Sequence, residues 1–266
     1  MASTIVAVDG GELWADDSGG DGPPLVLLHP GVGDSRFWEP VLPALTAAYR
    51  VIRYDARGFG SSPAPAVKYS LYDDLLVILG QYGLDRVAVT GCSQGGATAL
   101  SLAVEQPARV AALVLLCTGV PGYPWEDEPE PEDSELQAEY TRAFTAGDVD
   151  GLVAVNAQVW AAGTGGLTPA VLEQLRSAAR AELARGDLEQ RNPKAWDRLG
   201  SIAVPAALLV GDADYPPLVK VNKLAAARIP GCELTVVPGL DHLPALREPE
   251  LVTQVITRTL ARAGQW

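Results

Sequence analysis

The chain has 266 residues, of which 48% are hydrophobic and 20% charged, a balance typical of a globular protein with a full core. Asp and Glu total 33 and Lys and Arg total 20, so the formal net charge of −13 excludes a nucleic-acid-binding protein and one attracted to an anionic membrane surface. Three cysteines without a C-x-x-C spacing exclude a disulfide framework and a cysteine zinc site, and with an N-terminus unlike a signal peptide they predict a cytoplasmic protein.

The first half of the chain alternates strand-like with helix-like segments. It opens with a predicted hairpin made of Thr4–Val8 and Glu12–Asp16. Four short apolar runs then lack the alternation of a half-exposed strand, which is typical of parallel strands buried on both faces. These runs are Leu25–Leu28, Val51–Tyr54, Val87–Thr90 and Val110–Leu116, all far shorter than the ~20 residues that span a bilayer. The helical patterns between them are Arg36–Tyr49, Tyr72–Tyr82 and Gln94–Glu105. The alternation predicts an α/β sheet with right-handed crossovers.

The segment from Val120 to Ser201 has no strand pattern. It opens with the acidic run Glu126–Glu135, seven acids in ten residues, which we interpret as a solvated, mobile loop. Three helical patterns follow, at Glu135–Thr145, Val149–Ala161 and Thr168–Leu188. Two further strands, Ala206–Val210 and Glu233–Val237, then return to the sheet, with helices at Leu218–Arg228 and Pro249–Arg262. We therefore expect a core of residues 1–119 and 202–266 with a helical cap, residues 120–201, inserted in it.

A G-x-S-x-G pattern, formed by Gly91, Ser93 and Gly95, lies between the predicted strand Val87–Thr90 and the predicted helix Gln94–Glu105. This strand–turn–helix context is what a nucleophile elbow requires. The turn is so sharp that its flanking residues must be small, and it exposes the serine Oγ at the carboxyl end of the sheet. The N–H groups of the helix N-terminus can bind a developing oxyanion. Ser93 is therefore the candidate nucleophile.

A serine hydroxyl needs a base to take its proton, and the chain has two histidines. His242 follows the predicted strand Glu233–Val237, so it is expected on the same edge of the sheet as Ser93. We interpret His242 as the base. His29 follows the strand Leu25–Leu28 on that edge, and we interpret it as the residue that organises an oxyanion-binding loop.

The base needs a carboxylate that fixes its tautomer. The strand Ala206–Val210 ends in Gly211-Asp212-Ala213-Asp214, and Asp214 extends further toward the loop of His242. Asp214 is the preferred candidate and Asp212 the alternative. Asp241 is disfavoured because side chains of sequence neighbours usually diverge.

The chain resembles the α/β-hydrolase superfamily over nearly its whole length. The matching segments are His29–Gly33, Asp55–Ser61, Gly91–Gly95, Gly211–Asp214 and Gly239–Glu250. The resemblance implies an eight-stranded, mostly parallel sheet with a helical cap after the sixth strand, and a structural rather than catalytic turn at Asp55–Ser61. Within the superfamily the chain is most similar to bacterial esterases and lactonases of the enol-lactonase kind.

The family usually has His-Gly before its oxyanion residue, whereas this chain has His29-Pro30. Proline has no N–H, so the first oxyanion donor is expected to be the N–H of Gly31, with Val32 as the alternative. The second donor is expected to be the N–H of Gln94, the residue after the nucleophile.

The sequence thus predicts a serine hydrolase that cleaves a small, uncharged or apolar carboxylic ester or lactone through an acyl-enzyme, without metal or other cofactor. Six further residues are candidates for the substrate pocket: His29, Val32, Tyr123, Trp125, Trp160 and Trp196. The alternatives are a ligand receptor or regulator on a hydrolase scaffold, and the same triad used for carbon–carbon bond hydrolysis, thioester cleavage or perhydrolysis.

Overall fold

Eight strands form the main sheet in the computed structural model, which describes residues 1–125, 134–264 and 266. They are β1 (Ala2–Val8), β2 (Gly11–Asp17), β3 (Pro24–Leu28), β4 (Arg50–Tyr54), β6 (Val87–Cys92), β7 (Val110–Leu116), β9 (Ala206–Gly211) and β10 (Glu233–Val237). Their order in the sheet is β1-β2-β4-β3-β6-β7-β9-β10. β2 pairs antiparallel with β1 and β4, and the pairs from β4 to β10 are parallel. The expected mostly parallel, eight-stranded sheet is confirmed.

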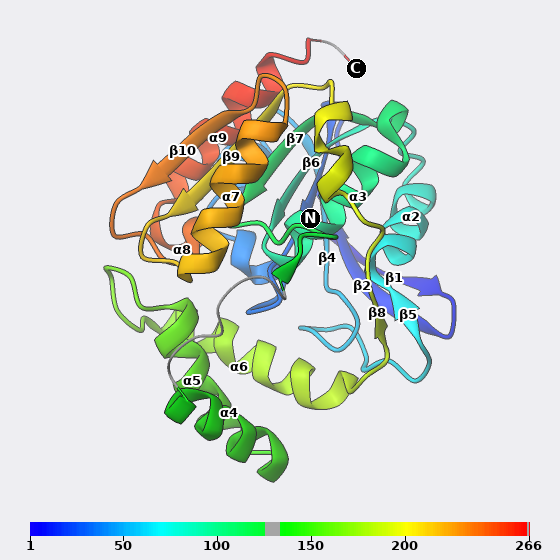
Figure 1. Cartoon of the computed structure of the whole chain (residues 1–266). Coiled ribbons are helices and arrows are strands. Elements are labelled where there is room, and N and C mark those ends of the chain that lie inside the picture. Colours follow the sequence, from blue (N-terminus) through cyan, green and yellow to red (C-terminus); the bar gives the residue numbers. More distant parts are fainter. Residues whose placement is uncertain (126–133, 265) are drawn as a thin grey trace.

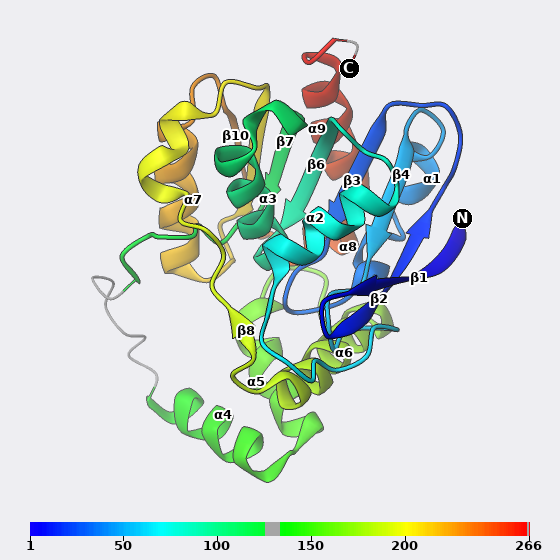
Figure 2. The same cartoon turned by 90° about the vertical axis from the view of Figure 1, so that its right-hand side faces the viewer.

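The central strands are buried because helices cover both faces of the sheet. On one face lie α2 (Leu71–Gln81), α3 (Gln94–Glu105) and α7 (Pro216–Arg228), and on the other lie α1 (Leu42–Leu45) and α9 (Pro249–Ala261) (Figures 1 and 2). Every residue of β6 and β7 is buried. Burial on both faces explains why these strands are continuously apolar.

The parallel strands end at one edge of the sheet, and the loops that leave this edge carry the candidate site. The register aligns Leu28 of β3 with Gly91 of β6, so the two strands end at the same level. The residues that follow β3, β6, β7 and β9 are His29, Ser93, Cys117 and Asp212. Ligand sites of open parallel sheets form at this edge.

The expected helix Arg36–Tyr49 is wrong as a single element. The structure has a 3₁₀ turn at Ser35–Trp38 and the four-residue helix α1, separated by a turn that contains Pro40. Proline has no N–H to donate and its ring clashes with the preceding helical turn, so a helix cannot run through it. Pro43 is accommodated because it lies in the first turn of α1.

Three helices lie between β7 and β9 in the chain and pack beyond the carboxyl edge of the sheet (Figure 1). We call α4 (Ser134–Ala146), α5 (Val149–Trp160) and α6 (Pro169–Arg185) the cap helices. A 3₁₀ helix at Trp196–Ser201 leads back to β9. The expected boundaries of the cap, residues 120–201, stay a prediction. Residues 126–133 of the acidic run lie outside the described part of the chain, and so does the interpretation placed on them.

A short two-stranded sheet joins the cap helices to the core, and the sequence pattern does not predict it. Its strands are β5 (Tyr69–Ser70) and β8 (Glu189–Gln190), which pair in parallel. Two further short helices are the 3₁₀ helix at Pro107–Arg109 and α8 (Pro244–Arg247). Across the described ranges, none of the helices combines the length and the apolar character needed to cross a bilayer.

Candidate active site

Ser93 occupies the sharp turn between β6 and α3. Its backbone has φ 52° and ψ −113°, a left-handed conformation that a residue other than glycine adopts at a cost. The surroundings hold this conformation, since Ser93 N–H donates to Leu116 O at 2.9 Å while Ser93 O accepts from Ala97 and Gly119 N–H at 2.9 and 3.1 Å. The side chain is partly exposed. The turn therefore presents the hydroxyl at the end of the sheet from a fixed backbone.

The glycines around Ser93 are required by close backbone contacts. A Cβ added to Gly91 would lie 2.4 Å from Gly95 O, and one added to Gly95 would lie 2.3 Å from Leu28 O. Real Cβ atoms do not approach carbonyl oxygens so closely, so both positions exclude a side chain. The G-x-S-x-G pattern is therefore a packing requirement of the turn, as the sequence analysis expects.

His242 and Asp214 are in direct contact. His242 Nδ1 lies 2.9 Å from Asp214 Oδ2 and 3.0 Å from Oδ1, and Tyr215 N–H donates to Oδ1 at 2.7 Å. Both side chains are buried, and His242 Nε2 has no hydrogen-bond partner among the described residues. Because Asp214 accepts a hydrogen bond from Nδ1–H, the proton of the neutral ring stays on Nδ1, and Nε2 is left free to accept one.

The other two candidate carboxylates have different partners. Asp212 is exposed and accepts a hydrogen bond from Gly239 N–H at 2.6 Å. Asp241 is buried and pairs with Arg247, whose Nη2 lies 2.7 Å from its Oδ2. Asp241 also accepts from Leu243 N–H at 3.1 Å, so it shapes the loop that carries His242.

Two buried cysteines pack behind the Asp214–His242 pair. The sulfur of Cys117 and ligand atoms of Asp214 and His242 lie within 4.8 Å of one another. Burial, followed by the nearby Asp214 charge, raises the pKa of Cys117 and of Cys92 well above the ordinary thiol value. Both are therefore protonated thiols, whereas a metal ligand or a nucleophile would be a thiolate.

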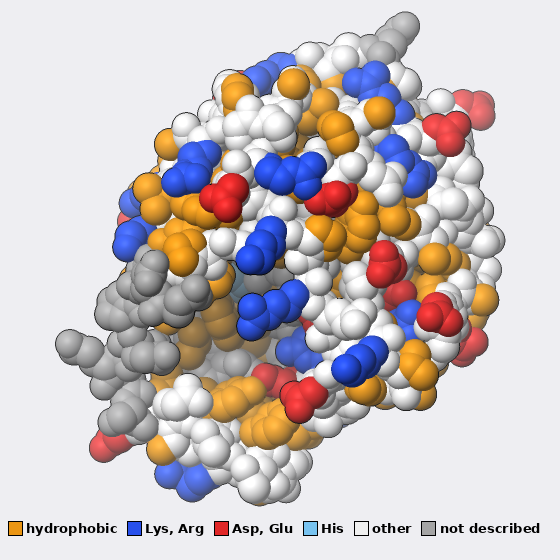
Figure 3. Space-filling view, turned by 45° about the vertical axis from the view of Figure 1, so that its right-hand side comes forward, with side chains coloured by type: hydrophobic (Ala, Val, Ile, Leu, Met, Phe, Trp, Pro, Cys, Tyr) orange, Lys and Arg blue, Asp and Glu red, His pale blue; other side chains and the backbone are white. Residues whose placement is uncertain are grey.

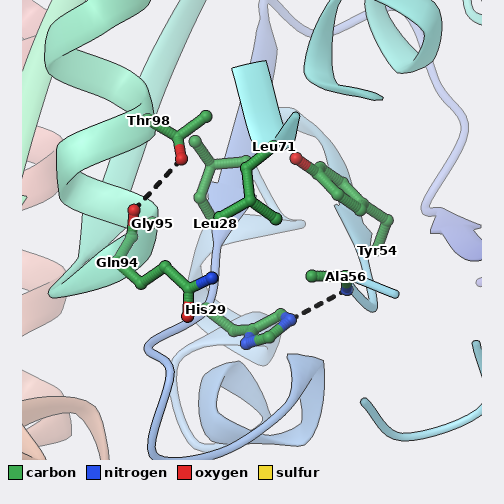
Figure 4. A pocket seen from close by; sticks show the side chains of 8 residues that line it. All are labelled: Leu28, His29, Tyr54, Ala56, Leu71, Gln94, Gly95 and Thr98. Atoms are coloured by element: carbon green, nitrogen blue, oxygen red, sulfur yellow. Dashed lines mark hydrogen bonds between the residues drawn. The ribbon is translucent and has the colours of Figure 1, made fainter. Parts of the chain in front are cut away.

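His29 uses both ring nitrogens in fixing the loop that follows β3. Its Nε2 accepts from Ala56 N–H at 3.0 Å, so its Nδ1 carries the proton and donates to Pro30 O at 2.8 Å. Figure 4 shows His29 facing Ala56, with the Gln94 side chain beside it. The space that these residues line holds about 20 Å³, enough for one water. His29 therefore has no free nitrogen with which to act as a base.

Two backbone N–H groups near Ser93 are available to a ligand. Neither Gly31 N–H nor Gln94 N–H donates a hydrogen bond to another residue in the described ranges. The two residues pack closely, since a Cβ on Gly31 would lie 2.5 Å from Gln94 Oε1. Gln94 Nε2 in turn donates to the Glu189 carboxylate of β8 at 3.2 Å. Val32, the alternative donor, is partly buried against the core.

The cap helix α6 contacts the end of the loop that follows β3. The sequence pattern does not predict this contact. Gln174 is buried, accepts from Asp34 N–H at 2.9 Å and donates to Asp34 Oδ1 at 3.3 Å. Arg36 Nη2 lies 2.6 Å from Asp34 Oδ2. Burial raises the pKa of Asp34, but hydrogen bonds from Arg36 and Ser177 outweigh it and lower the pKa to about 2. Asp34 is therefore a carboxylate that accepts from both the core and the cap.

A cavity of about 840 Å³ lies between the cap helices and the loop that follows β9. Figure 3 shows a hollow on this side of the molecule, with hydrophobic side chains in its depth. Its residues come from α4, from α5 and the turn after it, from α6 and from the β9–α7 loop: Leu136, Gln137, Tyr140, Val155, Asn156, Gln158, Val159, Trp160, Ala162, Glu182, and Asp212 to Pro216. The cavity therefore reaches Asp214, directly beside His242.

The structure separates the aromatic pocket candidates. Trp160 lines the large cavity, and its ring centroid lies 4.5 Å from that of His242. Tyr123 instead packs against Trp125 and Trp196, with ring centroids 4.9 and 4.8 Å away, and Arg228 lies over the Trp196 ring. These three rings are absent from the described lining of the cavity. Their role as pocket residues stays a prediction.

The comparison with known proteins decides the family. A family model described as the alpha/beta hydrolase fold matches residues 23–215, most of the chain. The chain belongs to the α/β-hydrolase family. The matched range includes the elbow, the cap helices and Asp214, and ends before His242.

The chain is also similar to curated proteins and to solved structures. The chain is 40% identical over 101 residues to a pimeloyl-[acyl-carrier protein] methyl ester esterase of Legionella pneumophila strain Lens, a match that covers 37% of this chain and 39% of that protein. It is 25% identical to 3-oxoadipate enol-lactonase 1 of Acinetobacter baylyi over 93% of this chain and 92% of that protein. The crystal structure of the esterase RhEst1 from Rhodococcus sp. ECU1013 superposes with a TM-score of 0.80 at 24% identity, covering 99% and 100% of the two chains. The last likeness shows the fold alone.

Proposed function

We propose that the protein is a serine hydrolase that cleaves a carboxylic ester or lactone through an acyl-enzyme intermediate. The observation that carries the proposal is the buried His242–Asp214 pair, which follows strands that end at the same edge of the sheet as Ser93 on its strained turn. Similarity to an enol-lactonase over 93% of the chain supports it. A fold by itself would not, since one fold serves many functions.

In the proposed mechanism His242 Nε2 takes the Ser93 proton while Oγ attacks the ester carbonyl. Asp214 fixes the tautomer that leaves Nε2 free and stabilises the imidazolium. The N–H groups of Gly31 and Gln94 bind the oxyanion of the tetrahedral intermediate. His242 then protonates the leaving alkoxide, and water, activated by the same histidine, releases the acid and restores Ser93.

The proposed substrates are small to medium, uncharged esters or lactones. The cavity beside the Asp214–His242 pair is lined mainly by hydrophobic and aromatic side chains, which favours an apolar part of the substrate. Three carboxylates, Glu182, Asp212 and Asp214, also line it and disfavour an anionic group in the cavity. Nothing in the proposed chemistry requires a cofactor.

The decisive experiment combines a fluorophosphonate probe with a panel of acyl esters, lactones and thioesters. We expect the probe to label Ser93 and to abolish hydrolysis, with oxygen esters or lactones turned over faster than thioesters. Preferred cleavage of thioesters would replace the proposal with thioester hydrolysis. Absence of labelling and of turnover across the panel would favour a ligand-binding role instead.

Replacing Gln174 by Leu is expected to lower kcat by roughly tenfold with little change in KM. The change removes two hydrogen bonds to Asp34 and leaves a buried N–H unpaired, which also costs about 1–3 kcal/mol of stability. A loosened loop misplaces Gly31 N–H, whose bond to the oxyanion strengthens only in the transition state. Steady-state kinetics and thermal unfolding give the two readouts.

The matched control is Glu173→Gln on the same helix. Glu173 Oε1 lies 3.2 Å from Arg36 Nη1, and both side chains are well exposed, so this pair contributes little. The control should keep the parental kcat and melting temperature. A Gln174→Leu protein that melts earlier but keeps its kcat would reduce Gln174 to a structural contact.

Replacing Trp160 by Ala is expected to shift the preference toward longer substrates. The change enlarges the cavity next to His242, so the ratio of kcat/KM for long over short acyl esters should rise by roughly tenfold. Because Trp160 also packs on His242, the rate of Ser93 labelling by a small probe is measured in parallel. Trp125→Ala, at a ring outside the described cavity lining, is the comparison. An unchanged chain-length profile in Trp160→Ala would remove that ring from the pocket.

A further inference from the structure

One polar side chain of the large cavity has no partner. Asn156 lies in α5, is 8% exposed and lines the cavity, yet its amide makes no hydrogen bond within the described chain. The Asn156 amide atoms are not among the fully enclosed polar atoms that lack a partner, so they reach the space of the cavity. A leucine would fill a similar volume but would offer a ligand in the cavity neither a donor nor an acceptor.

Other polar groups of the cavity are already engaged. Tyr140 hydroxyl donates to the Glu182 carboxylate, and Gln158 Nε2 donates to Ala154 O at 3.3 Å. Asp214 is held by His242 and Tyr215 N–H. Gln137 also lines the cavity without a side-chain hydrogen bond to a described residue, but it is exposed. Asn156 is therefore the buried polar side chain among the described lining residues that makes no hydrogen bond.

The position of Asn156 on α5 places it in line with the candidate catalytic residues. Trp160 is four residues later, so the two side chains lie on one helix face, separated by about 6 Å along the axis. Trp160 contacts His242 at the other end of this line. A substrate that extends from Ser93 past Trp160 would bring a group several bonds from its ester to Asn156.

The residues that line the cavity indicate which chemical group of a substrate Asn156 could bind. The Asn156 amide can both donate and accept, and so matches a ketone, amide or hydroxyl. Glu182 and Asp212 disfavour an added carboxylate. Figure 3 shows Lys and Arg side chains along one side of the hollow, but none is among the described lining residues. Val155, Val159 and Trp160 fit the apolar spacer.

We propose that Asn156 is a specificity-determining residue that binds a neutral carbonyl or hydroxyl group, carried on an apolar spacer several bonds from the scissile ester. The proposal rests on the proposed function and specifies its substrate class. A substrate that carries the carbonyl or hydroxyl group forms a hydrogen bond with the Asn156 amide. A substrate with methylenes at that place displaces water from the amide and leaves it without a partner.

The test compares esters that differ by one keto group. The probes are p-nitrophenyl hexanoate against p-nitrophenyl 5-oxohexanoate, and hexyl acetate against 5-oxohexyl acetate, so that both the acyl and the alcohol side are examined. In the parental protein, the keto ester of one of these two pairs should have a kcat/KM roughly 10–100-fold higher than that of its methylene counterpart. In Asn156→Leu this ratio should fall to about one. Gln254→Leu makes the same kind of change at an exposed amide of α9, outside the described cavity lining, and should keep the parental ratio.

Stability gives a readout independent of turnover. Because the Asn156 amide lies at the cavity and makes no hydrogen bond within the described chain, Asn156→Leu should keep its melting temperature within about 2 °C of the parental value. A clearly lower melting temperature would show that the amide has a structural role and would overturn the proposal. Equal keto-to-methylene ratios in the parental protein and Asn156→Leu would also overturn it. If Ser93→Ala still hydrolyses the plain esters, the proposed function itself fails, which separates the two failures.

Discussion

Ser93→Ala is expected to fold as the parental protein does and to lose roughly 10⁵–10⁶ of its kcat for esters, the loss typical of removing a triad nucleophile. The alanine removes the one atom that attacks the carbonyl, while the elbow keeps its backbone hydrogen bonds to Leu116, Ala97 and Gly119. Ester turnover and thermal unfolding, measured on the same preparations, test both halves of this expectation.

Covalent labelling supplies the control for Ser93. After reaction with an organophosphate, peptide mapping should place the adduct on Ser93. The neighbouring Cys92 should stay unmodified, since it is fully buried and its thiol pKa is raised by burial. An adduct on Cys92 or on another serine, together with retained activity of Ser93→Ala, would refute the proposed mechanism.

The sheet is largely predictable because each buried strand is a continuous apolar run. Val87–Thr90 and Val110–Leu116 both lie within observed strands, and β6 extends two residues further, into Gly91 and Cys92, which the apolar pattern leaves out. The prediction fails where local rules compete, as at Pro40, which divides the expected helix Arg36–Tyr49. The two-residue strand β8 is too short to show any periodicity.

The placement of Ser93, Asp214 and His242 is predictable for a topological reason. Each follows a strand of a parallel sheet, and the carboxyl ends of such strands meet at one edge. The topology then places residues 93, 214 and 242 at the same edge of the sheet without any knowledge of side-chain packing. The catalytic role assigned to them stays a prediction that the Ser93 and Asp214 variants test.

The contributions of the cap helices are not predictable in the same way. Asn156 is the one polar residue among the buried residues of α5, and Gln174 and Ser177 are the two polar ones among those of α6. One or two polar residues on a buried face are a weak sequence signal, because their meaning depends on what the helix packs against. The Gln174 amide contacts Asp34 and the Asn156 amide lies at a cavity, a difference that only the tertiary structure reveals. The tertiary structure is likewise needed to see that Trp160 lines this cavity, whereas Trp125 is not in its described lining.

The second large effect on activity is expected from replacing the carboxylate that contacts His242. Asp214→Asn is expected to lose roughly 10⁴ of kcat/KM, because an amide at this position no longer favours the tautomer with the proton on Nδ1. Asp212→Asn is the matched control: it makes the same chemical change two residues away, at an exposed side chain that bonds Gly239 N–H instead of His242. Its kcat/KM on the same ester should stay within a few-fold of the parental value. If Asp212→Asn were the more damaged variant, Asp212 would be the carboxylate that supports His242 during turnover, and the contact between Asp214 and His242 would be structural.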